Sequence, residues 1–79
     1  MNRFKLAEHK KLKHNNIINV ATGNKIGEVV WAHEKDEFPN HIRITDVNKE
    51  FTNVDLLELV NMMIYPSDYY EYSNHIIKK

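Results

Sequence analysis

Residues 51–66 read FTNVDLLELVNMMIYP, and this stretch predicts the principal helix of the protein. Thr52 can accept a hydrogen bond from the first free backbone amides, while Asp55, three residues later, can reach back to the Thr52 amide. Pro66 disfavours helical geometry at the residue before it, which is Tyr65. We therefore expect an α-helix from about residue 53 to about residue 64.

The predicted helix has an unusually wide apolar surface. Its polar residues fall at helical spacing on one narrow stripe, made of Asp55, Glu58, Asn61 and Tyr65. All its other residues after Asn53 are apolar, and this arc is wider than packing on a single sheet requires. Part of it must be covered by the N-terminal segment, by the C-terminal tail, or by another chain.

Residues 16–47 predict a three-stranded antiparallel sheet. Two β-rich runs flank a Gly23-Asn24 pair, which suits a two-residue type II′ turn and would place Ile17 opposite Val30. Gly27 inside the second run can mark a β-bulge. The stretch HIRITDV, residues 41–47, alternates as a third strand.

The two ends complete the expected α+β fold of a single domain spanning residues 1–79. Residues 1–14 suit a basic helix or arm, and residues 67–79 suit a short helix, with an edge strand as the alternative. The predicted fold is therefore a three-stranded antiparallel sheet with one well-capped helix packed on it and a short helical segment at each end.

Composition restricts the function. The chain has 79 residues and no cysteine, which excludes disulfides, thiolate metal sites and a cysteine nucleophile. Its longest apolar stretch is too short to cross a bilayer, and no apolar region of a secretory signal follows the N-terminal charges. These features predict a soluble, cytoplasmic protein.

No arrangement of residues predicts catalysis or a metal site. The five histidines, His9, His14, His33, His41 and His75, lack the spacing of metal ligands on one element. The acid pairs Asp36–Glu37 and Asp68–Glu71 lie in polar segments where water keeps carboxyl groups ionised. We therefore expect a protein that is not an enzyme and that has no cofactor and no bound metal.

The stretch YPSDYYEY, residues 65–72, contains all four tyrosines of the chain. Tyrosine forms interfaces at low entropic cost, and neighbouring rings such as Tyr69 and Tyr70 cannot both point inward from one element. Flexible methionines adapt to partners, and rim acids orient them. The sequence thus predicts a protein-binding surface formed by Tyr65, Tyr69, Tyr70, Tyr72, Met62 and Met63, with Asp68 and Glu71 at its rim.

The predicted function is a non-enzymatic module that binds a larger protein, or a second copy of itself, and modulates it by occupancy. Small accessory or inhibitory proteins of viruses act in this way, and the abundance of Asn, Lys and Ile is typical of AT-rich genomes.

A nucleic-acid-binding protein is the alternative. Residues 1–14 carry five bases against one acid, whereas residues 15–77 carry four bases against ten acids. In this alternative the phosphates are bound by Arg3, Lys5, Lys10, Lys11 and Lys13.

Overall fold

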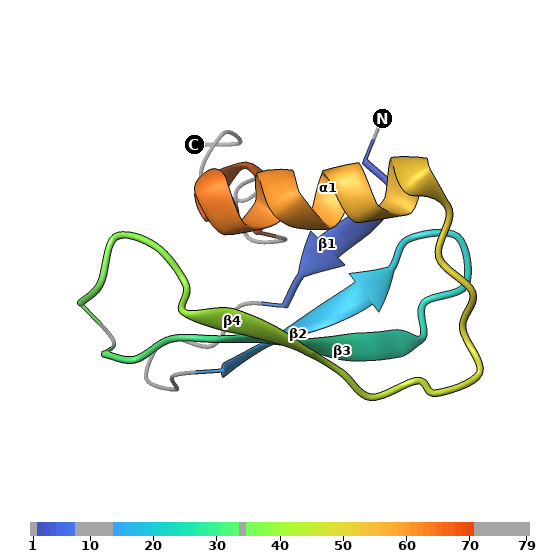
Figure 1. Ribbon diagram of the computed structural model, residues 1–79, viewed down its shortest axis with the longest axis horizontal. Helices are drawn as coiled ribbons and strands as arrows, with labels where there is room; N and C mark the ends of the chain where they lie inside the picture. Colours follow the sequence, from blue (N-terminus) through green and yellow to red (C-terminus); the bar gives the residue numbers. More distant parts are fainter. Residues whose placement is uncertain (1, 8–13, 34, 71–79) are drawn as a thin grey trace, which may run out of the picture.

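A computed structural model describes residues 2–7, 14–33 and 35–70. These residues form a four-stranded antiparallel sheet with one α-helix across it (Figure 1). In chain order the elements are β1 (Phe4–Leu6), β2 (His14–Asn19), β3 (Lys25–Val30), β4 (His41–Ile44), α1 (Asn53–Ile64) and a 3-10 turn, η1 (Pro66–Asp68). The strands follow one another in space as they do in sequence, so the α+β class is confirmed.

The prediction of three strands was wrong, because the N-terminal segment supplies a fourth. Phe4 and Leu6 are buried and the residue between them is only partly buried, which is the period of two that a strand requires. β1 pairs with β2, with Phe4 opposite Asn19 and Leu6 opposite Ile17. The predicted N-terminal helix is therefore absent from residues 2–7, and residues 8–13 of the basic arm lie outside the described residues.

The C-terminal end of the described chain is also not an α-helix. After η1 the backbone runs beside β1, where the Leu6 amide donates to the Tyr69 carbonyl at 2.8 Å and Tyr70 forms a parallel bridge with Leu6. The predicted tail helix thus does not begin at residue 67, and residues 71–79 lie outside the described residues. This contact fastens the segment after α1 to the edge of the sheet.

The β2–β3 hairpin forms with a different register from the predicted one. Gly23 has a positive φ of 76°, as a turn glycine should, but Ile17 lies opposite Gly27 rather than Val30. The loop is wider because Asn19 closes it: its amide donates to the Asn24 carbonyl at 2.9 Å, and its carbonyl accepts from Gly23 at 2.7 Å. Local hydrogen bonds of this asparagine therefore replace the two-residue turn.

The expected irregularity at Gly27 is present. Ile17 pairs with Gly27 and Ile18 pairs with Lys25, so Ile26 is an extra residue in β3. A Cβ on Gly27 would lie 2.5 Å from the Arg43 carbonyl oxygen, which explains why glycine is needed there. The bulge also lets Ile26 join Val29 in the core, although the two lie three positions apart along the strand.

The core lies between the sheet and α1. Its buried apolar side chains come from β1, β2, β3, α1 and the residue that follows η1: Phe4, Leu6, Ile17, Ile26, Val29, Leu59, Met62 and Tyr69. Asn15 is buried beside them, accepts from Trp31 Nε1 at 2.8 Å and from the Tyr70 hydroxyl at 3.3 Å, and donates to the Ala7 carbonyl. Within the described ranges, every buried side-chain nitrogen or oxygen has a hydrogen-bond partner.

A candidate protein-binding face on helix α1

The limits of α1 are those that the sequence predicts. The Thr52 hydroxyl accepts from the Asp55 amide at 3.1 Å, and the Asp55 carboxylate accepts from the Thr52 amide at 3.1 Å. This reciprocal pair is a complete capping box. At the other end the helix stops at Ile64, two residues before Pro66.

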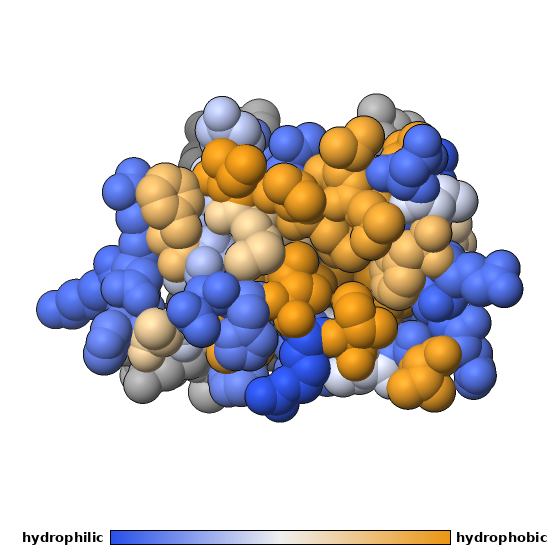
Figure 2. Space-filling view, viewed as in Figure 1, coloured by the Kyte–Doolittle hydropathy of each residue, from blue (hydrophilic) through white to orange (hydrophobic). Residues whose placement is uncertain are grey.

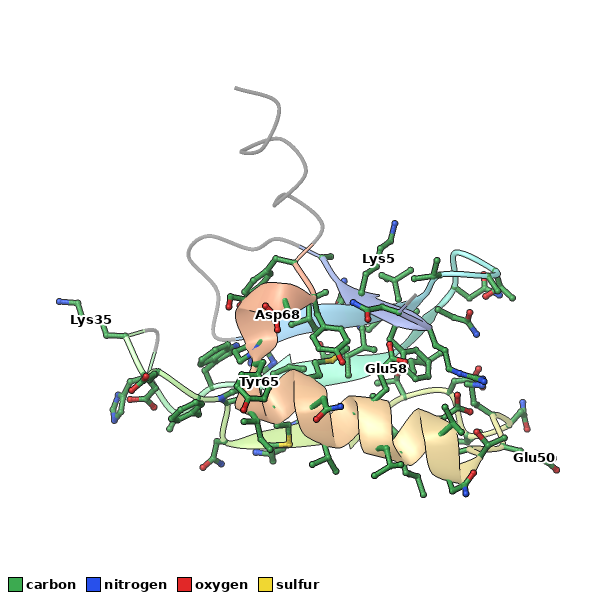
Figure 3. The ribbon with its side chains drawn as sticks, turned by 90° about the horizontal axis from the view of Figure 1, so that it is seen from above. Lys5, Lys35, Glu50, Glu58, Tyr65 and Asp68 are labelled. Atoms are coloured by element: carbon green, nitrogen blue, oxygen red, sulfur yellow. The ribbon has the colours of Figure 1, made fainter. Side chains whose placement is uncertain are left out.

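The two acids of the polar stripe of α1 face the protein, whereas Asn61 and Tyr65, the other two residues of the stripe, are exposed. Asp55 is buried together with Leu59 and Met62, and Glu58 is half-buried. Figure 3 shows Glu58 on the side of α1 that faces β1. The two acids of the helix are therefore part of its inner face, which is an unusual place for carboxylates unless they have partners.

Glu58 finds its partners on the backbone of the first strand. Its Oε1 accepts from the Arg3 amide at 2.6 Å and from the Phe4 amide at 2.9 Å. β1 is an edge strand, so these amides would otherwise have only water to bond with. A single carboxylate thus joins α1 to β1.

Asp55 has both backbone and cationic partners. Arg3 Nη1 lies 3.2 Å from its Oδ1, and Lys49 Nζ lies 3.9 Å from its Oδ2. The hydrogen bond from the Thr52 amide is the main cause that lowers the pKa of Asp55 below its ordinary value, and Lys49, the Thr52 hydroxyl and Arg3 act in the same direction against the opposing effect of burial.

The opposite side of α1 is exposed and, apart from Asn53 and Asn61, apolar. We define the outer face as five side chains that are 45% to 64% exposed: Val54, Leu56, Leu57, Val60 and Ile64. No charged side chain lies on this face, because Asp55 and Glu58 are the only charged residues of the helix. In Figure 2 apolar side chains gather in one area over α1 and continue below it over β4, where Ile44 is 39% exposed.

A hollow of about 580 Å³ adjoins the C-terminal end of this face. Half of the residues in its walls are aromatic, namely Trp31, Phe38, Tyr65 and Tyr70, and the polar residues Glu37 and Ser67 also line it. Ile64 lines it as well, so the hollow and the outer face are continuous. Tyr65 is 58% exposed and lies at the junction of α1 and η1 (Figure 3).

The structure separates the residues that the sequence proposes as anchors. Met62 and Tyr69 belong to the core, where burial first, and then Glu58 and Asp68, raise the pKa of Tyr69. Met63 and Tyr70 are half-buried, and among the described anchor residues Tyr65 is the one largely exposed ring. The rim residue Asp68 is exposed, while Glu71 and Tyr72 lie outside the described residues.

Tyr69 and Tyr70 are both turned toward the body of the protein, which differs from the expectation that one of them points outward. Tyr69 ends the 3-10 turn and Tyr70 begins the bridge to Leu6, so the two do not share one regular element. Tyr70 packs against the core and donates its hydroxyl to Asn15. The tyrosine cluster therefore serves mainly as internal packing in the described part of the chain.

The sequence did not identify the outer face as the exposed surface. It did contain a signal, because the apolar arc of the helix is too wide for one sheet contact. The direction was missed because Asp55 and Glu58 would ordinarily be placed in water, and their partners on β1 become visible only when that segment is known to be a strand.

The residues of the nucleic-acid alternative are only partly described. Arg3 is paired with Asp55, although its side chain is 53% exposed. Lys5 lies in β1 and has an interaction of its own. Lys10, Lys11 and Lys13 lie outside the described residues.

Three further observations concern metal binding, membrane insertion and similarity to known proteins. Among the described residues no three His, Asp or Glu side chains are grouped to hold a metal ion, and no described helix is long and apolar enough to cross a membrane. No protein-family model, curated protein or solved structure matches the chain. The outer face must therefore be interpreted from its own chemistry.

Proposed function

We propose that this protein is a small, non-enzymatic binding module that attaches to a larger protein through the outer face of α1 and modulates that partner by occupying its surface. The observation that carries this proposal is the exposure of five neighbouring apolar side chains on a helix whose charged residues both point inward. About half of the surface of each of these side chains is left in contact with water, where a partner can cover it.

The size of the apolar area supports a binding role. Five half-exposed aliphatic side chains present on the order of 400 Å², which is within the range of the largest patch on a typical monomer, and such patches are often functional. The aromatic hollow beside Ile64 extends this area. Interface cores are enriched in aromatic residues and depleted of charged ones. The hollow supplies aromatic rings, and the outer face has no charged side chain.

The mode of recognition that fits is a helix laid into a groove. An amphipathic helix offers anchors at positions i, i+4 and i+8, and Leu56, Val60 and Ile64 have this spacing. The partner's surface would be an apolar groove, because a charged groove would gain nothing from this face. An accessory or inhibitory role in the cytoplasm, in a virus or its host, belongs to the same proposal.

The test uses one charged substitution on the outer face. Leu57 is 64% exposed, the highest value among the apolar residues of α1, so Leu57→Glu should change the stability of the fold by less than about 0.5 kcal/mol. Tagged wild-type protein and the variant are used to capture partners from the native host, with quantitative mass spectrometry of the bound proteins. We expect the amount of the specific partner captured by the variant to be at least tenfold lower than the amount captured by the wild-type protein.

Val47→Glu is the matched control. Val47 is 88% exposed and lies in the loop after β4, so the same change of chemistry is made away from the helix. The control should capture the partner as wild type does. Equal capture by wild type, Leu57→Glu and Val47→Glu would show that the outer face is not the binding surface.

A further inference from the structure

We infer that, when no other partner is present, a second copy of this protein covers the outer face of α1, with the two helices antiparallel across a two-fold axis near Val60. This inference rests on the proposed function in one respect, since both treat the outer face as a protein-binding surface. It goes further by naming the occupant and the residues that meet.

The row of side chains along the outer face is self-complementary. Leu56, Val60 and Ile64 are spaced by four residues and are 52%, 54% and 45% exposed. The two outer side chains of the row are large and the central one is smaller, so the order of sizes is the same from either end of the row. Rows at this spacing are the ridges that pack between helices, and an antiparallel two-fold axis at Val60 places each Leu56 against the Ile64 of the other copy.

Electrostatics favours a second copy as the occupant. Most protein surfaces repel a copy of themselves where like charges meet across a two-fold axis, but the outer face has no charge to repel. The whole chain has a formal net charge of zero, so no long-range repulsion opposes the approach of two copies. A highly charged partner would find no complementary group on this face.

The available area is adequate for a weak or moderate dimer. With the neighbouring exposed side chains of Ile44, Phe38 and Tyr65, the apolar area is on the order of 700 Å², close to the ~800 Å² per partner of a standard interface. β4 lies on the same side of the molecule as this area and has no strand on its outer edge within the described ranges (Figures 1 and 2). The face thus continues to an open sheet edge, where a second copy can add contacts.

The absence of cysteine makes disulfide trapping decisive. Val60→Cys introduces the sole thiol of the chain at the proposed axis, where the Cα atoms of two packed helices can approach to the ~5–6 Å that a disulfide needs. Under mild oxidation we expect most of this variant to become a covalent dimer. Light scattering of the wild-type protein should show twice the monomer mass of 9.4 kDa, falling toward it on about a hundredfold dilution.

Val54→Cys is the matched control, since Val54 is also a valine of α1 and is 47% exposed. Six residues from the axis, its thiol would lie ~18 Å from its own copy along the helices, so it should cross-link at least tenfold more slowly. Leu56→Cys and Ile64→Cys should each cross-link poorly alone and efficiently when mixed. That result distinguishes an antiparallel arrangement from a parallel one, in which each would pair with itself.

Two outcomes separate this inference from the proposed function. The inference is overturned if the wild-type protein stays monomeric at all concentrations and Val60→Cys cross-links no faster than Val54→Cys. In that case, loss of partner capture by Leu57→Glu would still support the proposed function. A wild-type dimer with rapid Val60→Cys trapping supports the inference, even if Leu57→Glu captures a larger partner normally.

Discussion

The two sides of α1 do not divide into an apolar inner side and a polar outer side, as the sides of most surface helices do. The inner side contains both carboxylates of the helix, and Asp55 is only 4% exposed. The outer side contains five aliphatic side chains, the most exposed at 64%. A helix is thus oriented by the partners available to its polar groups as well as by the apolar area it can bury.

This orientation follows from the needs of the first strand. β1 is three residues long and lies at an edge, so it requires hydrogen-bond acceptors beyond β2. Glu58 supplies them to the Arg3 and Phe4 amides, and Asp55 accepts from the Arg3 guanidinium. Charge-assisted hydrogen bonds of this kind are stronger than neutral ones. Turning these acids inward leaves the remaining aliphatic arc in contact with water.

The largest expected effect comes from truncating the same residue type on the two sides. Leu59 is 6% exposed and lies in the core, whereas Leu57 is 64% exposed. Leu59→Ala should destabilise the fold by about 2–4 kcal/mol, because it removes buried contacts and leaves a cavity. Leu57→Ala should stay within about 0.5 kcal/mol of wild type.

Chemical denaturation at low protein concentration measures both values without a contribution from association. Alanine is favourable in helices, so neither change weakens α1 through propensity. Similar losses in the two variants would mean that the outer face is covered by the chain itself, and the distinction between the two sides would then fail.

A smaller effect is expected at the carboxylate that joins α1 to β1. Glu58→Ala removes the acceptor of two backbone amides and should cost about 1–3 kcal/mol, because the Phe4 amide is partly buried. Glu58→Gln keeps an oxygen acceptor and should recover part of this loss. Hydrogen exchange at the Phe4 amide is the direct measurement, and it should accelerate in Glu58→Ala.

Glu50→Ala serves as the control for the general loss of a negative charge, since Glu50 is exposed and precedes the helix. It should leave the exchange of the Phe4 amide unchanged. If Glu58→Ala also leaves this exchange unchanged, the carboxylate does not hold β1, and the inward orientation of Asp55 and Glu58 would need another cause.

The sequence predicts best the features that depend on local chemistry. The helix begins and ends as the capping box and Pro66 predict, and a bulge occurs at Gly27. These features are determined by residues within a few positions of one another. The α+β class is also correct, because the strand and helix patterns are each clear within one segment.

Features that depend on contacts between distant segments could not be predicted in the same way. β1 contains three residues, too few for a reliable period, and its strand character depends on pairing with β2 and on Glu58, more than fifty residues away. The hairpin register depends on how Asn19 closes the loop. The outer face was missed for the same reason, since its exposure follows from what the opposite side of α1 binds.

The smallest expected effect is the pH dependence that Asp55 contributes. Its pKa in the folded protein is below the ordinary value of 3.8, so between these two values the unfolded chain binds more protons than the folded one. The stabilisation of the fold by ionised Asp55 is therefore present above about pH 4 and is lost as the pH falls toward the folded pKa.

Thermal unfolding between pH 2 and pH 6 should show this loss of stability in the wild-type protein and a shallower dependence of stability on pH in Asp55→Asn. Glu37→Gln, at an exposed residue of the loop between β3 and β4, is the control for the loss of one carboxyl group and should keep the wild-type slope. An unchanged slope in Asp55→Asn would show that the charge of Asp55 does not stabilise the fold. The hydrogen bonds of Glu58 would then be the remaining explanation for why the acids of α1 face the sheet.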